Sequence, residues 1–281
     1  MTPRSISPAA PDGGRRRAAP VATGPEALRR LRAGAPPGWV EGVLGRVGLR
    51  PPDHFVLVPG PAGELFVAFN DEGISAVDLA ARHGGDPARF AAAHRRATGR
   101  PARGAARPPA GLAAALRSGR GAGLRYDLAA LTPFERAVLA ATLEIPPGEV
   151  RPYGWVAGRI GRPRAVRAVG SALGRNPVPV LIPCHRVVRT DGQVGNYGLG
   201  PPVKRALLSA EGLDLDRLER LASAGTRFVG SATTGVFCVP SCTHARRITP
   251  AHEVAFRSSA SAESAGFRPC TRCLPTAAAA S

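Results

Sequence analysis

Apolar residues recur with two different periods along the chain. From His54 onward, β-rich runs at residues 55–58, 65–69 and 74–79 alternate with glycine and proline turn signals. Alternation of short apolar runs with such turns is typical of hairpin-connected strands. The pattern therefore predicts a small antiparallel meander that begins near residue 54.

Further along, the apolar period lengthens to that of a helix. Residues 87–98 favour a helix within a stretch at 84–125 that otherwise resembles a Pro/Arg/Gly-rich linker. At Thr132 the segment TPFERAVLAATLEI offers an N-cap, a proline at the first helical position and Glu135 three residues after the cap. This combination is a capping box, and it predicts a helix start.

Two shorter helical segments follow, at 153–161 and 163–174, and the turn Gly161-Arg162-Pro163 lies where they meet. This spacing is typical of a helix-turn-helix. In the second segment, Val166, Val169 and Leu173 form an inward stripe. Another face is almost bare, so that it can approach a groove closely, and it consists of Ala165, Ala168 and Ala172.

The patterns predict an α+β protein divided into four regions. Residues 1–38 are rich in Pro, Gly, Ala and Arg, lack a periodic apolar pattern and are expected to form a disordered tail. We expect a strand-rich domain with its linker at 39–125, a helical domain at 126–218 and a cysteine module at 222–275.

Composition adds a preference for polyanionic partners. The chain holds 38 Lys plus Arg against 20 Asp plus Glu, a formal net charge of +18, which attracts phosphates. An Arg-rich composition without any DNA contact explains the charge equally well. No apolar run reaches the length of a membrane span, and no apolar segment of a secretory signal follows the N-terminal arginines. We therefore expect a cytoplasmic protein whose five cysteines are thiols and not disulfides.

Cys184 follows a short apolar run that should be buried, and it directly precedes His185 and Arg186. A thiol is mostly protonated at neutral pH, so a base and a nearby positive charge are needed to make it a nucleophile. His185 is the candidate base. Buried free cysteines and core histidines are common, however, so the dipeptide alone leaves a purely structural interpretation open.

A longer pattern narrows the choice. The string RNPVPVLIPCHRVV, followed by GNYG and KRALLSAEG, resembles the active-site region of the O6-alkylguanine-DNA alkyltransferases. The resemblance is strong over residues 131–212 and weak over 55–79. It implies a ribonuclease H-like N-terminal domain and a winged-helix-like domain that contains the helix-turn-helix. It also implies a methylated-DNA-[protein]-cysteine S-methyltransferase that acts once, because a thioether does not release its alkyl group.

The resemblance also assigns roles to single residues. Cys184 is the alkyl acceptor, His185 the base that acts through a bridging water, and Glu211 the carboxylate that orients His185. Asn176 braces the active-site turn, and Tyr153 helps to rotate the phosphate and assists the departing guanine.

For DNA binding, Arg167 matches the arginine that fills the gap left by a flipped nucleotide. The other expected DNA-binding residues are Ala165, Ala168 and Gly170 on the second helix, and Tyr197 in the loop that lines the base pocket. Pro152, Gly198, Pro201 and Pro202 depart from the family pattern, which leaves the tolerance for bulky alkyl groups open.

Four cysteines form two pairs near the end of the chain. Three residues separate Cys238 from Cys242, two separate Cys270 from Cys273, and 27 lie between the pairs. This spacing predicts one tetrahedral Zn²⁺ site, with disulfides or unligated thiols as the alternatives. The strings TTGVFCVPSC and SAGFRPCTRC resemble the metal-binding domain of the Ada proteins, which implies that Cys238 accepts methyl from DNA phosphotriesters. A purely structural zinc site is the rival interpretation.

The expected partner is double-stranded DNA with an alkylated guanine, bound by a monomer that uses no small-molecule cofactor. The Ada-like module comes last here, whereas the family usually places it first and follows it with an AraC-type segment. We therefore expect repair to matter more than gene control. A methylation-sensing transcriptional regulator is the alternative, and a binder of alkylated DNA that transfers nothing is a third possibility.

Overall fold

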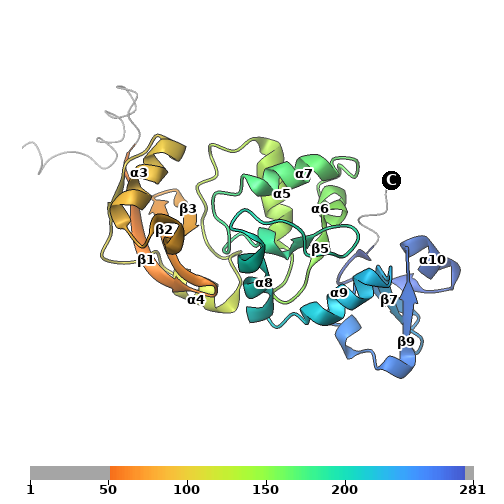
Figure 1. Cartoon of the computed structure of the whole chain (residues 1–281). Coiled ribbons are helices and arrows are strands. Elements are labelled where there is room, and N and C mark those ends of the chain that lie inside the picture. Colours follow the sequence, from red (N-terminus) through yellow and green to blue (C-terminus); the bar gives the residue numbers. More distant parts are fainter. Residues whose placement is uncertain (1–50, 276–281) are drawn as a thin grey trace, which may run out of the picture. The chain divides into compact units, whose positions relative to one another are not determined.

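The computed structural model describes residues 51–275, so the predicted tail at 1–38 lies outside the described residues. The described chain opens with three antiparallel strands, β1 (Asp53–Gly60), β2 (Gly63–Asn70) and β3 (Gly73–Leu79). A short fourth strand, β4 (Ala102–Gly104), runs parallel to β1 and completes a sheet of order β3-β2-β1-β4 (Figure 1). The predicted meander is confirmed.

One face of this sheet is covered by η1 (Ala80–His83) and α3 (Pro87–Thr98). Asp86 caps α3 by accepting a hydrogen bond from the Ala88 backbone, and Gly99 ends the helix in the left-handed conformation. The helix spans the predicted residues. Phe90 anchors it, because its ring stacks on Phe66 with the centroids 4.7 Å apart.

A buried polar network ties the sheet to the chain that leaves it. Asp53 is fully buried and accepts hydrogen bonds from Ser75 and Asn70, and its carboxylate lies 3.0 Å from His94. Burial alone would raise the pKa of Asp53, but these partners lower it to about 2. Arg100 pairs with both Asp53 and Asp127, so residue 127 is held against the sheet. No local sequence pattern predicts this network, because its members are far apart along the chain.

The region predicted as linker contains a further helix, α4 (Leu112–Ser118), which we did not expect. Gly111 and Gly119 flank this helix, both with positive φ, and Leu112 and Leu116 are buried. The helix after it, α5 (Pro133–Leu143), begins as predicted. Thr132 accepts from the Glu135 backbone, and the Glu135 side chain accepts from Thr132.

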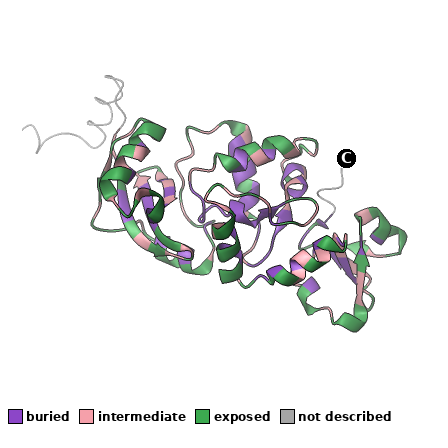
Figure 2. Cartoon of the chain, viewed as in Figure 1, coloured by how far each residue is buried: buried purple, intermediate pink, exposed green. Residues whose placement is uncertain are grey.

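The predicted helix-turn-helix corresponds to α6 (Tyr153–Arg159) and α7 (Val166–Gly174). Figure 2 shows buried residues concentrated on α5 and α6, whereas α3 is mostly exposed. Val169 and Leu173 point inward as expected. The prediction of an exposed alanine face is wrong at Ala172, which is only 1% exposed and belongs to the core. Ala165 is the N-cap of α7 and does not lie inside the helix, which starts at Val166.

A two-stranded parallel ladder lies next to the helices. It pairs β5 (Arg151–Pro152) with β6 (Val187–Val188), and the short turn η2 (Cys184–Arg186) leads directly into β6. Two helices follow, α8 (Pro201–Ala210) and α9 (Leu215–Ser223).

The last described segment forms a second four-stranded sheet. Its strands are β7 (Phe228–Ser231), β8 (Val236–Cys238), β9 (Glu253–Phe256) and β10 (Arg268–Pro269), in the order β10-β8-β7-β9. The turns η3 (Ala245–Arg247) and η4 (Pro250–His252) and the helix α10 (Ser259–Ser264) complete it. The fold is thus α+β, as predicted. Among residues 51–275, every helix is too short or too polar to traverse a lipid bilayer.

Candidate active site and candidate metal centre

Cys184 opens the turn η2 and is 8% exposed, after the buried run at residues 178–182. The Asn176 side chain makes three hydrogen bonds to the segment that leads to the cysteine. Its amide nitrogen donates to the Ile182 carbonyl and to the Cys184 sulfur, both at 3.0 Å, and its oxygen accepts from the Val178 backbone at 3.0 Å. Asn176 thus links the residues before Cys184 to its sulfur, whereas its role in transfer stays a prediction.

Val180, in the middle of the same loop, has a φ of 73°. A β-branched residue in the left-handed region is strained, because its side chain crowds the backbone there. Two features hold Val180 in this conformation. Its side chain is buried, at 7% exposure, and the Ile182 backbone donates a hydrogen bond to the Val178 carbonyl. The loop thus stores backbone strain directly before the cysteine.

His185 and Glu211 form a buried pair beside Cys184. The His185 Nε2 atom lies 2.9 Å from a Glu211 carboxylate oxygen, and His185 is 1% exposed. Arg186 also donates to both oxygens of Glu211, and to the carbonyls of Ile145 and Gly119. Burial alone would raise the pKa of Glu211, but His185 and Arg186 lower it to about 2. Glu211 is therefore a carboxylate at neutral pH.

The protonation states of this group suit proton transfer from the thiol. Burial lowers the pKa of His185 despite the opposing effect of Glu211, so the ring is neutral at pH 7. Its Nδ1 atom is buried and has no hydrogen-bond partner among the described residues. Burial raises the pKa of the Cys184 thiol, although Asn176 and Lys204 oppose the rise. The thiol thus needs a base, and a neutral imidazole is its sequence neighbour.

Lys204 is a member of this site that the sequence analysis missed. It is fully buried on α8, and its ammonium donates to the carbonyls of Val187 and Asn196 at 2.7 and 3.3 Å. Burial lowers its pKa to about 8, and its charge opposes the rise in the Cys184 pKa. Helical periodicity could have predicted its burial, because Lys204 shares the inward face of α8 with Leu207 and Leu208.

Two tyrosines approach the cysteine from different elements. Tyr153 begins α6, and burial together with Cys184 raises its pKa. Tyr197 places its ring centroid 6.2 Å from that of His185. Its buried hydroxyl lies near Cys184 and has no partner that meets hydrogen-bond geometry within residues 51–275. The structure therefore brings Tyr153, Asn176, His185, Tyr197 and Glu211 together around Cys184.

The remaining predicted DNA-binding residues lie on α7 or at its start. Arg167 and Ala168 are exposed, whereas Ala165 and Gly170 are half-buried. A methyl group added at Gly170 would meet the Tyr153 ring at 3.8 Å, which is ordinary contact. The exposed arginine and alanine leave this side of α7 accessible to solvent, and its contact with DNA stays a prediction.

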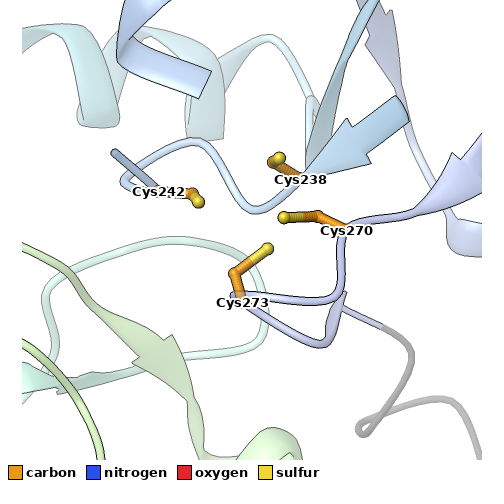
Figure 3. A group of neighbouring side chains, drawn as sticks. All are labelled: Cys238, Cys242, Cys270 and Cys273. Carbon is orange, nitrogen blue, oxygen red and sulfur yellow. The ribbon is translucent and has the colours of Figure 1, made fainter. Parts of the chain in front are cut away.

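The four other cysteines form one cluster. Their sulfur atoms all lie within 4.8 Å of one another, and all four residues are buried. Figure 3 shows the sulfurs directed toward a common centre, with Cys238 at the end of a strand and Cys242 on the loop after it. Cys270 and Cys273 come from the loop after β10. Four thiolates about 2.3 Å from one Zn²⁺ give sulfur separations within this limit, so the donor set fits zinc.

Hydrogen bonding between Cys238 and Cys242 raises the pKa of the first thiol and lowers that of the second. The Nδ1 atom of His244 lies 3.6 Å from the Cys270 sulfur. Disulfides are not formed, since all five cysteines are free.

The fold and these two sites define a class of protein: a domain with a helix-turn-helix and a buried cysteine beside a base, joined to a four-cysteine metal-binding domain. Residues 133–213 match the family model for the DNA-binding domain of 6-O-methylguanine DNA methyltransferase. Residues 218–276 match the model for the metal-binding domain of Ada. The chain thus contains one region similar to the DNA-binding domain of 6-O-methylguanine DNA methyltransferase and a second region similar to the metal-binding domain of Ada.

Individual relatives agree with these matches. The chain is 47% identical over 81 residues to the methylated-DNA–protein-cysteine methyltransferase of Methanosarcina acetivorans, which covers 29% of this chain and 52% of the relative. It is 50% identical over 80 residues to that of Mycobacterium tuberculosis, with 28% and 48% covered. The chain thus spans about half the length of these relatives. A crystal structure of Mycobacterium tuberculosis OGT in complex with DNA is 32% identical, with 57% of this chain and 93% of that chain covered and a TM-score of 0.45.

Proposed function

We propose that the protein repairs double-stranded DNA by moving an alkyl group, methyl in the simplest case, from O6-alkylguanine to Cys184 in a single turnover. The observation that supports this most directly is the placement of Cys184. Its thiol is buried, held by Asn176 at 3.0 Å and adjacent to a neutral His185 that is paired with ionised Glu211. Nucleophile, base and orienting carboxylate together constitute an activated nucleophile.

The transfer proceeds as follows in this proposal. His185 takes the thiol proton of Cys184 through a bridging water, and Glu211 stabilises the imidazolium that results. The thiolate attacks the alkyl carbon, so that a carbon–sulfur bond forms as the carbon–oxygen bond breaks. The electron pair stays on the guanine, which takes a proton from the Tyr153 hydroxyl. The proton that His185 received from the thiol is released to water, and water returns one to Tyr153, so that both side chains end neutral. The thioether product has no easy leaving group, so the protein acts once.

The damaged base must leave the helix to reach Cys184, because the sulfur is almost fully buried. We assign Arg167 to the gap left by the base, and the small residues Ala165, Ala168 and Gly170 to close approach in the minor groove. Tyr197 lines the pocket beside His185. The net charge of +18 supplies attraction to the phosphates.

At the four-cysteine cluster we propose one Zn²⁺, held by Cys238, Cys242, Cys270 and Cys273. When bound, the metal keeps its ligand sulfurs as thiolates without the need for a base. Cys238 is the proposed acceptor of methyl from phosphotriesters. A purely structural zinc site is the second candidate, favoured by the burial of Cys238 at 2% exposure.

The finer assignments go with this proposal. The first sheet corresponds to a ribonuclease H-like domain, and α6 and α7 belong to a winged-helix-like domain. We also propose that the protein is a cytoplasmic monomer and that transfer at Cys184 needs no small-molecule cofactor. These assignments extend from the family resemblance.

Intact-protein mass spectrometry tests the function. The protein is incubated with a duplex that contains one O6-methylguanine, and the modified cysteine is located by peptide mapping. We expect one added methyl on Cys184 at a one-to-one limit, and none on Cys184→Ser. Unmodified protein that still binds the duplex would refute transfer and favour the methylation-sensing regulator.

A further inference from the structure

Residues on both sides of Cys242 contact a short segment at 149–155, which lies directly before and within the start of α6. The Ser241 hydroxyl accepts from the Val150 backbone nitrogen at 2.9 Å and donates to the Val150 carbonyl at 3.0 Å. On the other side, the Thr243 hydroxyl donates to Glu149 at 2.8 Å, and the Thr243 backbone donates to the same oxygen at 3.2 Å. The loop that carries Cys238 and Cys242 is thus bonded to the 149–155 segment.

The second cysteine loop contacts the same segment. The Cys273 carbonyl accepts a hydrogen bond from the Trp155 indole at 3.0 Å, and the Arg272 guanidinium lies 3.6 Å from Glu149. Glu149 is fully buried and Trp155 is 4% exposed, so neither could turn to water if these partners moved away. Arg151 holds one carboxylate oxygen of Glu149, so loss of these contacts would leave the other oxygen and the Trp155 indole without their partners. An unpaired buried polar group is costly.

The 149–155 segment in turn supports the transfer site. Its strand β5 pairs with β6, and β6 directly follows the turn that contains Cys184 and His185. Val150 and Val188 also share a buried apolar cluster with Leu218 of α9, and Leu221 of the same helix packs against the cluster that contains the four cysteines. One continuous set of contacts therefore joins the cysteine loops to the strand next to Cys184.

We infer that metal binding at the four cysteines and ordering of the Cys184 site are coupled through the 149–155 segment. A metal bound by all four sulfurs fixes both cysteine loops at once, and both loops hold this segment. Coupling of this kind is reciprocal, so a weakened contact on the 149–155 side must also weaken metal binding. The inference rests on zinc binding at the cluster but not on alkyl transfer by either site.

Zinc affinity measures the reciprocal effect. Competition with a chromophoric chelator would be run on the full chain with Zn²⁺ as the probe. Trp155→Phe removes the indole donor but keeps an aromatic ring, and Ser241→Ala removes the hydroxyl. Each should weaken zinc binding about fivefold, as the loss of one hydrogen bond implies. The matched control is Ser264→Ala, at an exposed serine of α10, which should bind zinc as the parent does.

Equal affinity in all four proteins would overturn the coupling and leave the proposed function intact. A parent protein that binds no zinc would overturn both the coupling and the proposed zinc site, although not transfer at Cys184. The two kinds of failure are therefore distinguishable.

Hydrogen exchange on the unmodified sequence gives a test that does not depend on how a variant folds. Amide exchange would be compared with zinc present and after its removal, in the absence of DNA. We expect faster exchange without zinc at residues 150–151 and 187–188, with β1 to β3 unchanged. Unchanged exchange at 150–151 and 187–188 would refute the coupling, and so would a uniform increase that included β1 to β3, since that would be global unfolding.

Discussion

The two cysteine sites solve one problem in different ways. Burial raises the pKa of Cys184, and in the proposed mechanism His185, paired with Glu211, takes its proton, while the charge of Lys204 opposes the rise. The four clustered cysteines instead offer a complete set of zinc ligands. A buried thiol must lose its proton before it can act as a nucleophile or a metal ligand, and either a positioned base or a bound cation can bring this about. Loss of the base should therefore impair Cys184, whereas loss of the metal should impair the four clustered cysteines.

The largest expected effect separates the two sites directly. Cys184→Ala should abolish methyl transfer from O6-methylguanine, because the other four cysteines belong to the separate metal-binding cluster. Cys238→Ser should leave this transfer measurable, since Cys238 belongs to the other cluster. Quantitative mass spectrometry with a methylated duplex checks both. Transfer that persisted in Cys184→Ala would refute the assignment of Cys184 as the methyl acceptor.

Removal of zinc should affect the clustered cysteines far more than Cys184. A small metal-binding domain draws much of its folding free energy from the metal. After chelation we expect the four clustered thiols to react with a thiol reagent many times faster than in the metal-loaded protein. Cys184 should remain the slowest of the five. Peptide mapping of the labelled sites gives the rates, and equal labelling of all five cysteines would contradict the expectation.

Glu211→Gln should lower the rate of transfer about 100-fold, because a neutral amide stabilises the imidazolium poorly. The folded state should also lose roughly 2 kcal/mol, since the buried Arg186 guanidinium loses its charged partner. Single-turnover kinetics and urea unfolding measure the two effects. As a control, Glu219→Gln changes an exposed ion pair with Arg205 and should alter neither by much.

Acid should weaken the fold through the same carboxylate. The pKa of Glu211 falls from its ordinary 4.5 to about 2 on folding. Its stabilising contribution is therefore complete above pH 4.5 and is lost as the pH falls toward 2. Unfolding free energies measured from pH 5 to pH 3 should decline less steeply in Glu211→Gln than in the parent. Identical slopes would show that the His185–Glu211–Arg186 group does not control acid stability.

The smallest expected effect lies away from both sites. Thr132→Ala removes the N-cap of α5 and should cost about 1 kcal/mol of unfolding free energy. Transfer by Cys184 and zinc binding should both stay unchanged, because α5 carries no residue of either site. Urea denaturation measures the loss, and a change in the transfer rate would show that α5 controls more than stability.

Local patterns predicted much of the fold. The strands β1 to β3, the helix α3 and the start of α5 follow from apolar periodicity and from caps only a few residues long. The helix α4 was missed, because it lies between two glycines in a segment with a linker-like composition. Ala172 was assigned to the wrong face, since a small residue can be buried as easily as exposed.

The site was predictable only where a motif is contiguous. Cys184, His185 and the paired cysteines stand out in the sequence, and the structure gathers the expected partners Asn176 and Glu211 around Cys184. Long-range contacts carry no comparable local signal. The burial of Lys204, the strain at Val180 and the bond between Ser241 and Val150 all depend on segments brought together by folding.

One such contact affects how a minimal repair domain could be cut from this chain. The Val77 backbone of β3 donates to the Pro177 carbonyl at 2.9 Å, so the first sheet is bonded to the loop before Cys184. The matched region at 133–213 leaves that strand out. A fragment trimmed to the matched region would keep Cys184, His185 and Glu211. It would lose the hydrogen bond from β3 to the loop before Cys184. For protein engineering, the shortest useful clone should therefore start before β1.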